Sequence, residues 1–156
     1  MKYVDTKVVF REVPDEVALA INISGCPVKC PGCHSSYLVQ DIGEPLDSAS
    51  LDKLIDENPG ISCVSFMGGD ADPAYVRWLA LQVRGRGLRT CWYSGRGIEN
   101  ARPFLDALDF VKVGPFIDEC GPLDNPQTNQ RFYRVIAGAG GVQLEDWTYR
   151  FRKQIF

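Results

Sequence analysis

The sequence has no long apolar segment and no excess of basic residues. No apolar run approaches the roughly 18 residues that a bilayer-spanning helix requires, so we expect no membrane span. The net charge of −3 argues against a nucleic-acid binder, because contacts to phosphates require a basic surface. The first residues lack the apolar core and cleavage site of a signal peptide. We therefore expect a cytoplasmic protein.

Internal repeats, low-complexity tracts and interdomain linkers are also absent. A chain of 156 residues is close to the commonest size of a single domain. Hydrophobic residues make up 45% and charged residues 24%, as in ordinary globular proteins. We expect one domain over residues 1–156.

Six cysteines are present, and a reducing compartment disfavours disulfide bonds between them. Cys63 and Cys91 lie in strand-like segments, where a free cysteine packs as a small hydrophobe. Cys120 lies in a loop rich in glycine and proline. The other three cysteines stand within eight residues of one another, at 26, 30 and 33.

Cys26, Cys30 and Cys33 have the spacing C-x3-C-x2-C and follow the apolar segment 17–24. Thiolates this close can converge on one metal centre. A structural zinc site normally takes four protein ligands, and a cubane iron–sulfur cluster takes four cysteines. Three thiolates would leave one iron of a cluster open to a ligand that is not protein. Alternatively, His34, the only histidine, supplies a fourth ligand and makes a Cys3His zinc site in an interaction module.

Strand-like and helix-like segments alternate along the chain. Apolar and β-branched runs predict strands at residues 7–10, 17–24, 61–67, 88–93, 110–113 and 131–136. Apolar residues at helical spacing predict helices at residues 48–58, 73–85 and 98–108. The segment 144–156 is compatible with a helix, although its mixed aromatic and basic content does not distinguish a helix from other structures. The alternation predicts an α/β fold with a mostly parallel sheet.

Ligands of parallel sheets bind beyond the carboxyl ends of the strands. The cysteine loop, the run Gly68-Gly69-Asp70 and the run Ser94-Gly95-Arg96-Gly97 each follow a predicted strand. The glycine pair allows a close approach of the backbone to a ligand, and the Asp70 carboxylate could accept from an ammonium group. We therefore expect one ligand site at this edge.

The cysteine spacing resembles the cluster motif of radical S-adenosylmethionine (SAM) enzymes, and Gly68-Gly69-Asp70 resembles their Gly-Gly-Glu/Asp motif. Within that superfamily the chain is most similar to the anaerobic ribonucleoside-triphosphate reductase activating proteins. Similarities run from about residue 17 to 133 and include Gly69–Pro73, Trp92–Gly95, Val113–Phe116 and Thr128–Arg131.

The resemblance implies an incomplete (β/α) barrel of the radical SAM type, with five to six mostly parallel strands and one open side. It implies a [4Fe–4S] cluster held by Cys26, Cys30 and Cys33, whose open iron binds the amino and carboxylate groups of S-adenosylmethionine. The residues that would contact the cofactor are Gly32, Cys33, His34, Gly68, Gly69, Asp70 and Ser94. Because Ala71 separates Asp70 from Asp72-Pro73, either aspartate is a candidate for the contact to the ammonium group.

The function implied is that of an enzyme, a radical SAM activase that generates a glycyl radical on the anaerobic ribonucleotide reductase. A low-potential electron donor such as flavodoxin or ferredoxin would be a second partner. Activation of another glycyl-radical enzyme and a small-molecule radical SAM reaction remain as alternatives. The zinc module is the alternative from another class, but it leaves Gly68-Gly69-Asp70 without a purpose.

Overall fold

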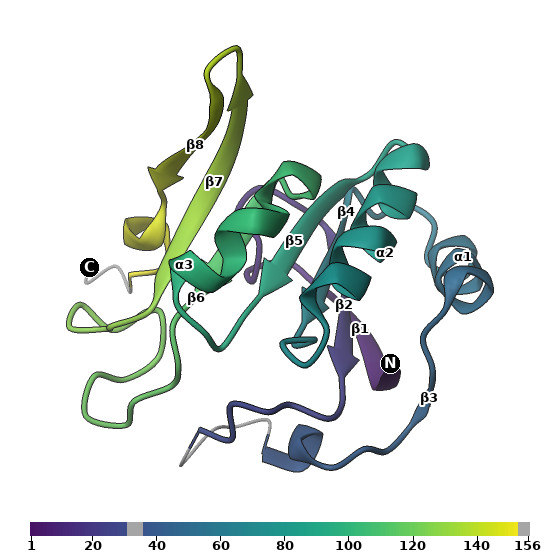
Figure 1. Ribbon diagram of the computed structural model, residues 1–156, viewed down its shortest axis with the longest axis horizontal. Coiled ribbons are helices and arrows are strands. Elements are labelled where there is room, and N and C mark those ends of the chain that lie inside the picture. The colour runs from purple at the N-terminus through teal and green to yellow at the C-terminus, as the bar shows by residue number, and fades with distance from the viewer. Residues whose placement is uncertain (31–35, 153–156) are drawn as a thin grey trace.

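The computed structural model describes residues 1–30 and 36–152 (Figure 1). Eight strands form one sheet in the order β3-β1-β2-β4-β5-β6-β7-β8. The strands are β1 (Lys2–Val9), β2 (Ala18–Ile23), β3 (Glu44–Pro45), β4 (Cys63–Met67), β5 (Arg89–Tyr93), β6 (Phe110–Val113), β7 (Arg131–Gly138) and β8 (Gly141–Asp146). In Figure 1 the β7–β8 hairpin extends away from the other strands.

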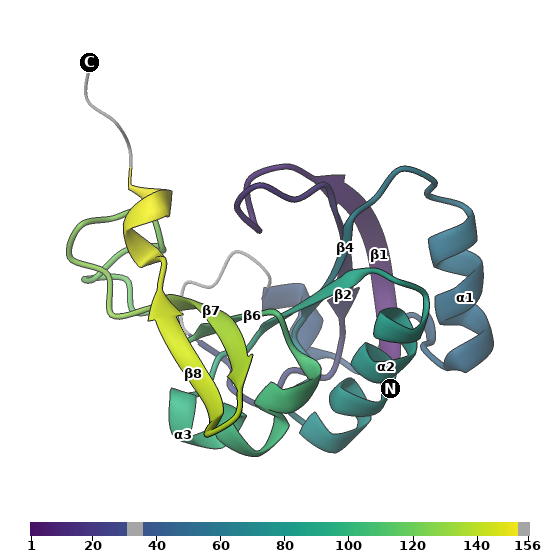
Figure 2. The same ribbon diagram turned by 90° about the horizontal axis from the view of Figure 1, so that it is seen from above.

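Helices connect the central strands. The α-helices are α1 (Ser48–Asp56), α2 (Pro73–Gly85) and α3 (Ile98–Ala101), and the 3₁₀ helices are η1 (Ser36–Val39), η2 (Arg102–Ala107) and η3 (Thr148–Phe151). Figure 2 shows α2 and α3 on one face of the curved sheet, and the β1–β2 loop and η3 on the other. None of the helices in the described ranges is long and apolar enough to cross a membrane.

The predicted barrel of five to six mostly parallel strands is wrong. Three pairings, β2–β4, β4–β5 and β5–β6, are parallel, whereas the four pairings β1–β2, β1–β3, β6–β7 and β7–β8 are antiparallel. The described residues form only three α-helices. For β1 and β2 the physical reason is the length of the connection, because a parallel crossover needs a dozen or more residues and residues 10–17 are too few.

The predicted starts of α1 and α2 are confirmed. The Asp47 carboxylate accepts from the Ser50 N–H at 2.9 Å, and the Ser50 hydroxyl accepts from the Asp47 N–H at 2.8 Å, which is a capping box. Pro73 begins α2, where its missing N–H costs no hydrogen bond. The helix predicted over 98–108 is divided into α3 and η2, and Pro103 stands at the start of the second element.

The described part of the C-terminal segment, residues 144–152, does not form the single helix considered from the sequence, because residues 144–146 belong to β8 and only Thr148–Phe151 are helical, as η3. Residues 141–146 are β8, which pairs with β7 across the turn at residues 139–140. Gly141 favours this tight turn, because its φ of +106° is one that other residues adopt only under strain.

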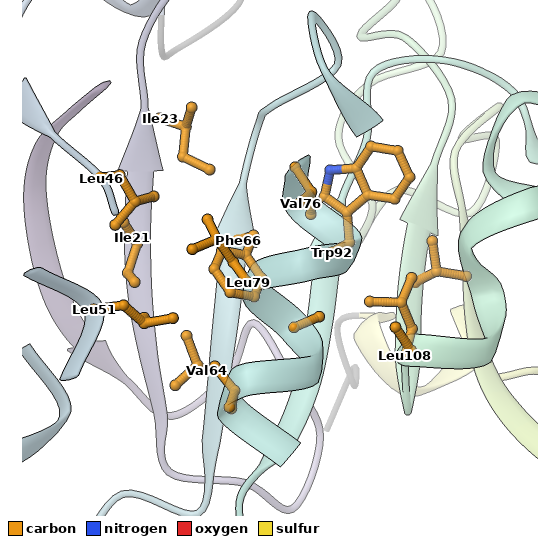
Figure 3. Packing of buried hydrophobic residues seen from close by; sticks show 14 of the residues in the cluster. Ile21, Ile23, Leu46, Leu51, Val64, Phe66, Val76, Leu79, Trp92 and Leu108 are labelled. Atoms are coloured by element: carbon orange, nitrogen blue, oxygen red, sulfur yellow. The ribbon is translucent and has the colours of Figure 1, made fainter. Parts of the chain in front are cut away.

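Apolar residues fill both faces of the sheet. On the helical face Phe66, Leu79 and Trp92 pack between β4, β5 and α2 (Figure 3), and all three are buried. On the opposite face Cys63 and Cys91 are fully buried among aromatic and aliphatic side chains, which confirms their predicted packing. Burial raises the pKa of both thiols, to about 12 for Cys91, so neither is a ready source of thiolate.

Candidate functional site

The parallel strands β2, β4, β5 and β6 all end at one edge of the sheet. The loops that follow them hold the described parts of the predicted site. Hydrogen bonds join these loops in sequence, because the Gly68 N–H donates to the Tyr93 carbonyl at 3.0 Å and the Ser94 N–H to the Lys112 carbonyl at 2.8 Å. The structure therefore brings together the loops after β4, β5 and β6.

Cys26 and Cys30 lie in the loop after β2 and are partly buried, with free thiols. The base of this loop is fixed by the Cys26 N–H, which donates to the Leu38 carbonyl at 2.9 Å. Gly32, Cys33 and His34, which were also predicted as site residues, lie outside the described residues. Within the described ranges, no three His, Cys, Asp or Glu side chains form a metal site.

The described donor atoms fit an iron–sulfur cluster. Thiolates are the ligands that such clusters take, and Cys26 and Cys30 have the partial exposure that the fully buried Cys63 lacks. In addition, the Phe116 N–H donates to Cys30 Sγ at 3.4 Å. Hydrogen bonds of this kind to ligating sulfur tune the metal in cluster sites.

The loop after β4 needs glycine at both positions of the pair. Gly68 and Gly69 have φ angles of +110° and +97°, which disfavour any other residue. A Cβ atom on Gly69 would lie 2.5 Å from Val76 Cγ2, and the Gly68 carbonyl accepts from Trp92 Nε1 at 2.8 Å. The two glycines thus allow the turn to pack closely against α2 and β5.

Asp70 and Ser94, both predicted as cofactor contacts, contact each other. Both side chains are buried, and the Ser94 hydroxyl donates to Asp70 Oδ1. The Gly95 N–H donates to Asp70 Oδ2 at 2.9 Å. Asp70 therefore fixes the loop after β5, although a carboxylate has lone pairs for further donors. Asp72, the other candidate, caps α2 by accepting from the Tyr75 N–H at 3.2 Å.

Lys112 contacts two of the site loops, a role that the sequence reasoning missed. Its ammonium group is buried and donates to the Gly114 carbonyl at 2.9 Å and to the Ser94 carbonyl at 3.3 Å. It also lies 5.9 Å from the centre of the Tyr93 ring. Lysine is almost never fully buried unless it is paired. A lysine between the valines of a predicted buried strand could therefore have indicated that its ammonium group has polar partners.

Two cavities lie apart from the predicted site residues that the structure describes. A cavity of about 670 Å³ is lined by the β1–β2 loop, residues 122–124 and residues 150–152, together with Tyr93. A second one of about 600 Å³ lies between α1 and α2. Neither is lined by a predicted site residue of the described ranges.

The comparison with known proteins is consistent with the cysteine motif. Residues 17–133, about three quarters of the chain, match the family model of the 4Fe-4S single cluster domain. The chain therefore belongs to this iron–sulfur family, and the three motif cysteines lie inside the matched range. No curated protein and no solved structure matches the chain.

Proposed function

We propose that the protein is a radical SAM activase. It cleaves S-adenosylmethionine reductively and generates a glycyl radical on the anaerobic ribonucleoside-triphosphate reductase. The observation that carries the proposal is the three-cysteine motif of a 4Fe-4S family, whose Cys26 and Cys30 lie at the same sheet edge as Gly68-Gly69-Asp70. A three-cysteine site leaves one iron for a ligand from outside the protein.

Cys26, Cys30 and Cys33 would hold the cluster. When bound, the cluster would supply the electron, received from flavodoxin or ferredoxin, for reductive cleavage of S-adenosylmethionine to methionine and the 5′-deoxyadenosyl radical. Gly68 and Gly69 carry no side chain that would keep the cofactor from the loop, and the Gly68 N–H and carbonyl hold this loop to Tyr93 and Trp92. Asp70 and Lys112 keep the neighbouring loops in place, so that the contacts are preorganised.

The positions of the two cavities favour a protein substrate over a small molecule. The two cavities, of about 670 and 600 Å³, are lined by none of the predicted site residues that the structure describes. A small substrate needs a concave pocket that buries most of its surface. A glycine on a mobile segment of a partner needs only access to the sheet edge. We therefore propose the reductase, rather than a metabolite, as the substrate.

The proposal is tested by product analysis without oxygen. The reconstituted protein is incubated with a reductant, S-adenosylmethionine and the reductase, and 5′-deoxyadenosine and the glycyl radical are measured. We expect both products from the wild type, and neither from C26A, C30A or C33A. C120A is the matched control and should retain both, because Cys120 is a partly exposed cysteine outside the motif.

Two outcomes would redirect the proposal. Formation of 5′-deoxyadenosine without a glycyl radical would leave SAM cleavage in place and exclude this reductase as the partner. Stoichiometric zinc without any cluster would exclude radical chemistry and favour the Cys3His module. In that case H34A should lose the metal, whereas a cluster held by three cysteines is retained in H34A.

A further inference from the structure

The loop after β6 contacts the described part of the cysteine loop through a backbone N–H. Gly114 leaves the strand with a φ of +105°, and its N–H donates to the Arg96 carbonyl at 2.7 Å. Two residues later, the Phe116 N–H donates to Cys30 Sγ at 3.4 Å. The structure thus places a backbone donor on a predicted cluster ligand.

Asn129 holds the same peptide group from its other side. Asn129 Nδ2 donates to the Pro115 carbonyl at 3.0 Å. The Pro115 carbonyl and the Phe116 N–H belong to one planar trans peptide, in which the two groups point in opposite directions. A donor that fixes the carbonyl oxygen therefore also fixes the direction of the N–H toward Cys30. Polarisation of the carbonyl also strengthens the N–H as a donor.

The orientation of the Asn129 amide is determined by these contacts. Exchanging Oδ1 and Nδ2 would place two carbonyl oxygens against each other at the Pro115 carbonyl. In the orientation present, Oδ1 is buried and has no hydrogen-bond partner among the described residues. A buried acceptor without a partner is unfavourable, so packing alone does not explain an asparagine here. The hydrogen bond that Asn129 Nδ2 donates to the Pro115 carbonyl explains why an asparagine stands here.

We propose that Asn129 is a positioning residue for the iron–sulfur cluster. It orients the Pro115–Phe116 peptide so that the Phe116 N–H donates to the Cys30 thiolate, and this bond raises the reduction potential of the cluster. A donor to a ligating sulfur stabilises the more negatively charged reduced state, and hydrogen bonds to sulfur are among the factors that set such potentials. The proposal requires only the cluster of the family, so it stands independently of SAM cleavage.

The test measures the midpoint potential of the reconstituted cluster in the absence of S-adenosylmethionine and of any reductase. N129L removes the donor at similar size, and we expect its midpoint potential to shift to more negative values. N125L is the matched control, because Asn125 lies in the same loop and accepts from the Gln127 N–H. Its potential should equal that of the wild type. A wild-type potential in N129L would overturn the proposal.

A second pair of variants decides the question if N129L does not fold. F116P lacks the N–H, whereas F116L keeps it, so only F116P should show the negative shift. The double variant N129L/F116P should shift no further than F116P, because both changes remove the same bond. In the cluster-free protein, hydrogen exchange at the Phe116 amide should be faster in N129L than in N125L. Equal potentials in F116P and F116L would also overturn the proposal.

Discussion

The replacement of Gly69 by alanine is the sharpest test of how the site loop is built. The φ angle of +97° is a conformation that an L side chain adopts at a cost of about 1–2 kcal/mol. The added Cβ would lie 2.5 Å from Val76 Cγ2, and Val76 is buried and has one strongly preferred rotamer in a helix. Overpacking of this kind costs about 1–3 kcal/mol. We expect G69A to lower the free energy of unfolding by about 2–5 kcal/mol.

Urea unfolding of the cluster-free protein, followed by far-ultraviolet circular dichroism, measures this change. G140A is the matched control, because Gly140 lies in the β7–β8 turn without a positive φ, and a Cβ added there would meet no atom within 4 Å. It should stay within about 0.5 kcal/mol of the wild type. In G69A/V76A the contact is relieved but the φ strain remains. The loss in the free energy of unfolding should therefore be smaller in the double variant than the sum of the two single losses. A G69A protein as stable as G140A would refute this account of the loop.

Two further predictions concern polar contacts of the fold. S94A removes a donor to the buried Asp70 carboxylate, and we expect a loss of about 1–3 kcal/mol in the free energy of unfolding, measured by urea unfolding at pH 7. The ion pair of Arg77 with Asp106 joins α2 to η2, and a hydrogen bond from Arg77 lowers the pKa of the Asp106 carboxyl. Because the folded pKa is lowered, the stabilisation is present above the unfolded pKa near 4 and is lost as the pH falls through the folded pKa. R77Q should therefore be slightly less stable than the wild type at pH 7, and the two should converge in thermal unfolding at low pH; a difference that grew on acidification would contradict this.

Helical and strand periodicity located the central elements of the fold well. The predicted strands at residues 61–67, 88–93 and 110–113 contain β4, β5 and β6, and Pro73 marks the start of α2. These elements were predicted correctly because local capping and the burial pattern agree with the tertiary structure. The direction of the outer strands is a property of the connections, which periodicity does not reveal. The eight residues 10–17 were a usable signal against a parallel crossover at β1 and β2.

The position of the site loops could be predicted from the sequence, whereas the contacts between them could not. Strand ends in a parallel region converge, so the loops containing Gly68 and Ser94 could be placed at one edge before the structure was known. The hydrogen bond between Ser94 and Asp70 joins residues 24 positions apart and depends on the pairing of β4 with β5. Likewise, the contact of Asn129 with the Pro115 carbonyl depends on the path of the β6–β7 loop, which no local pattern determines.

The central claim is that a cluster held by three cysteines leaves one iron open to S-adenosylmethionine. Electron paramagnetic resonance of the protein, reconstituted with iron and sulfide without oxygen and then reduced, tests it most directly. We predict a [4Fe–4S] signal whose shape changes when S-adenosylmethionine is added, and no such signal in C26A or C30A. A cluster signal that S-adenosylmethionine leaves unchanged would contradict the account.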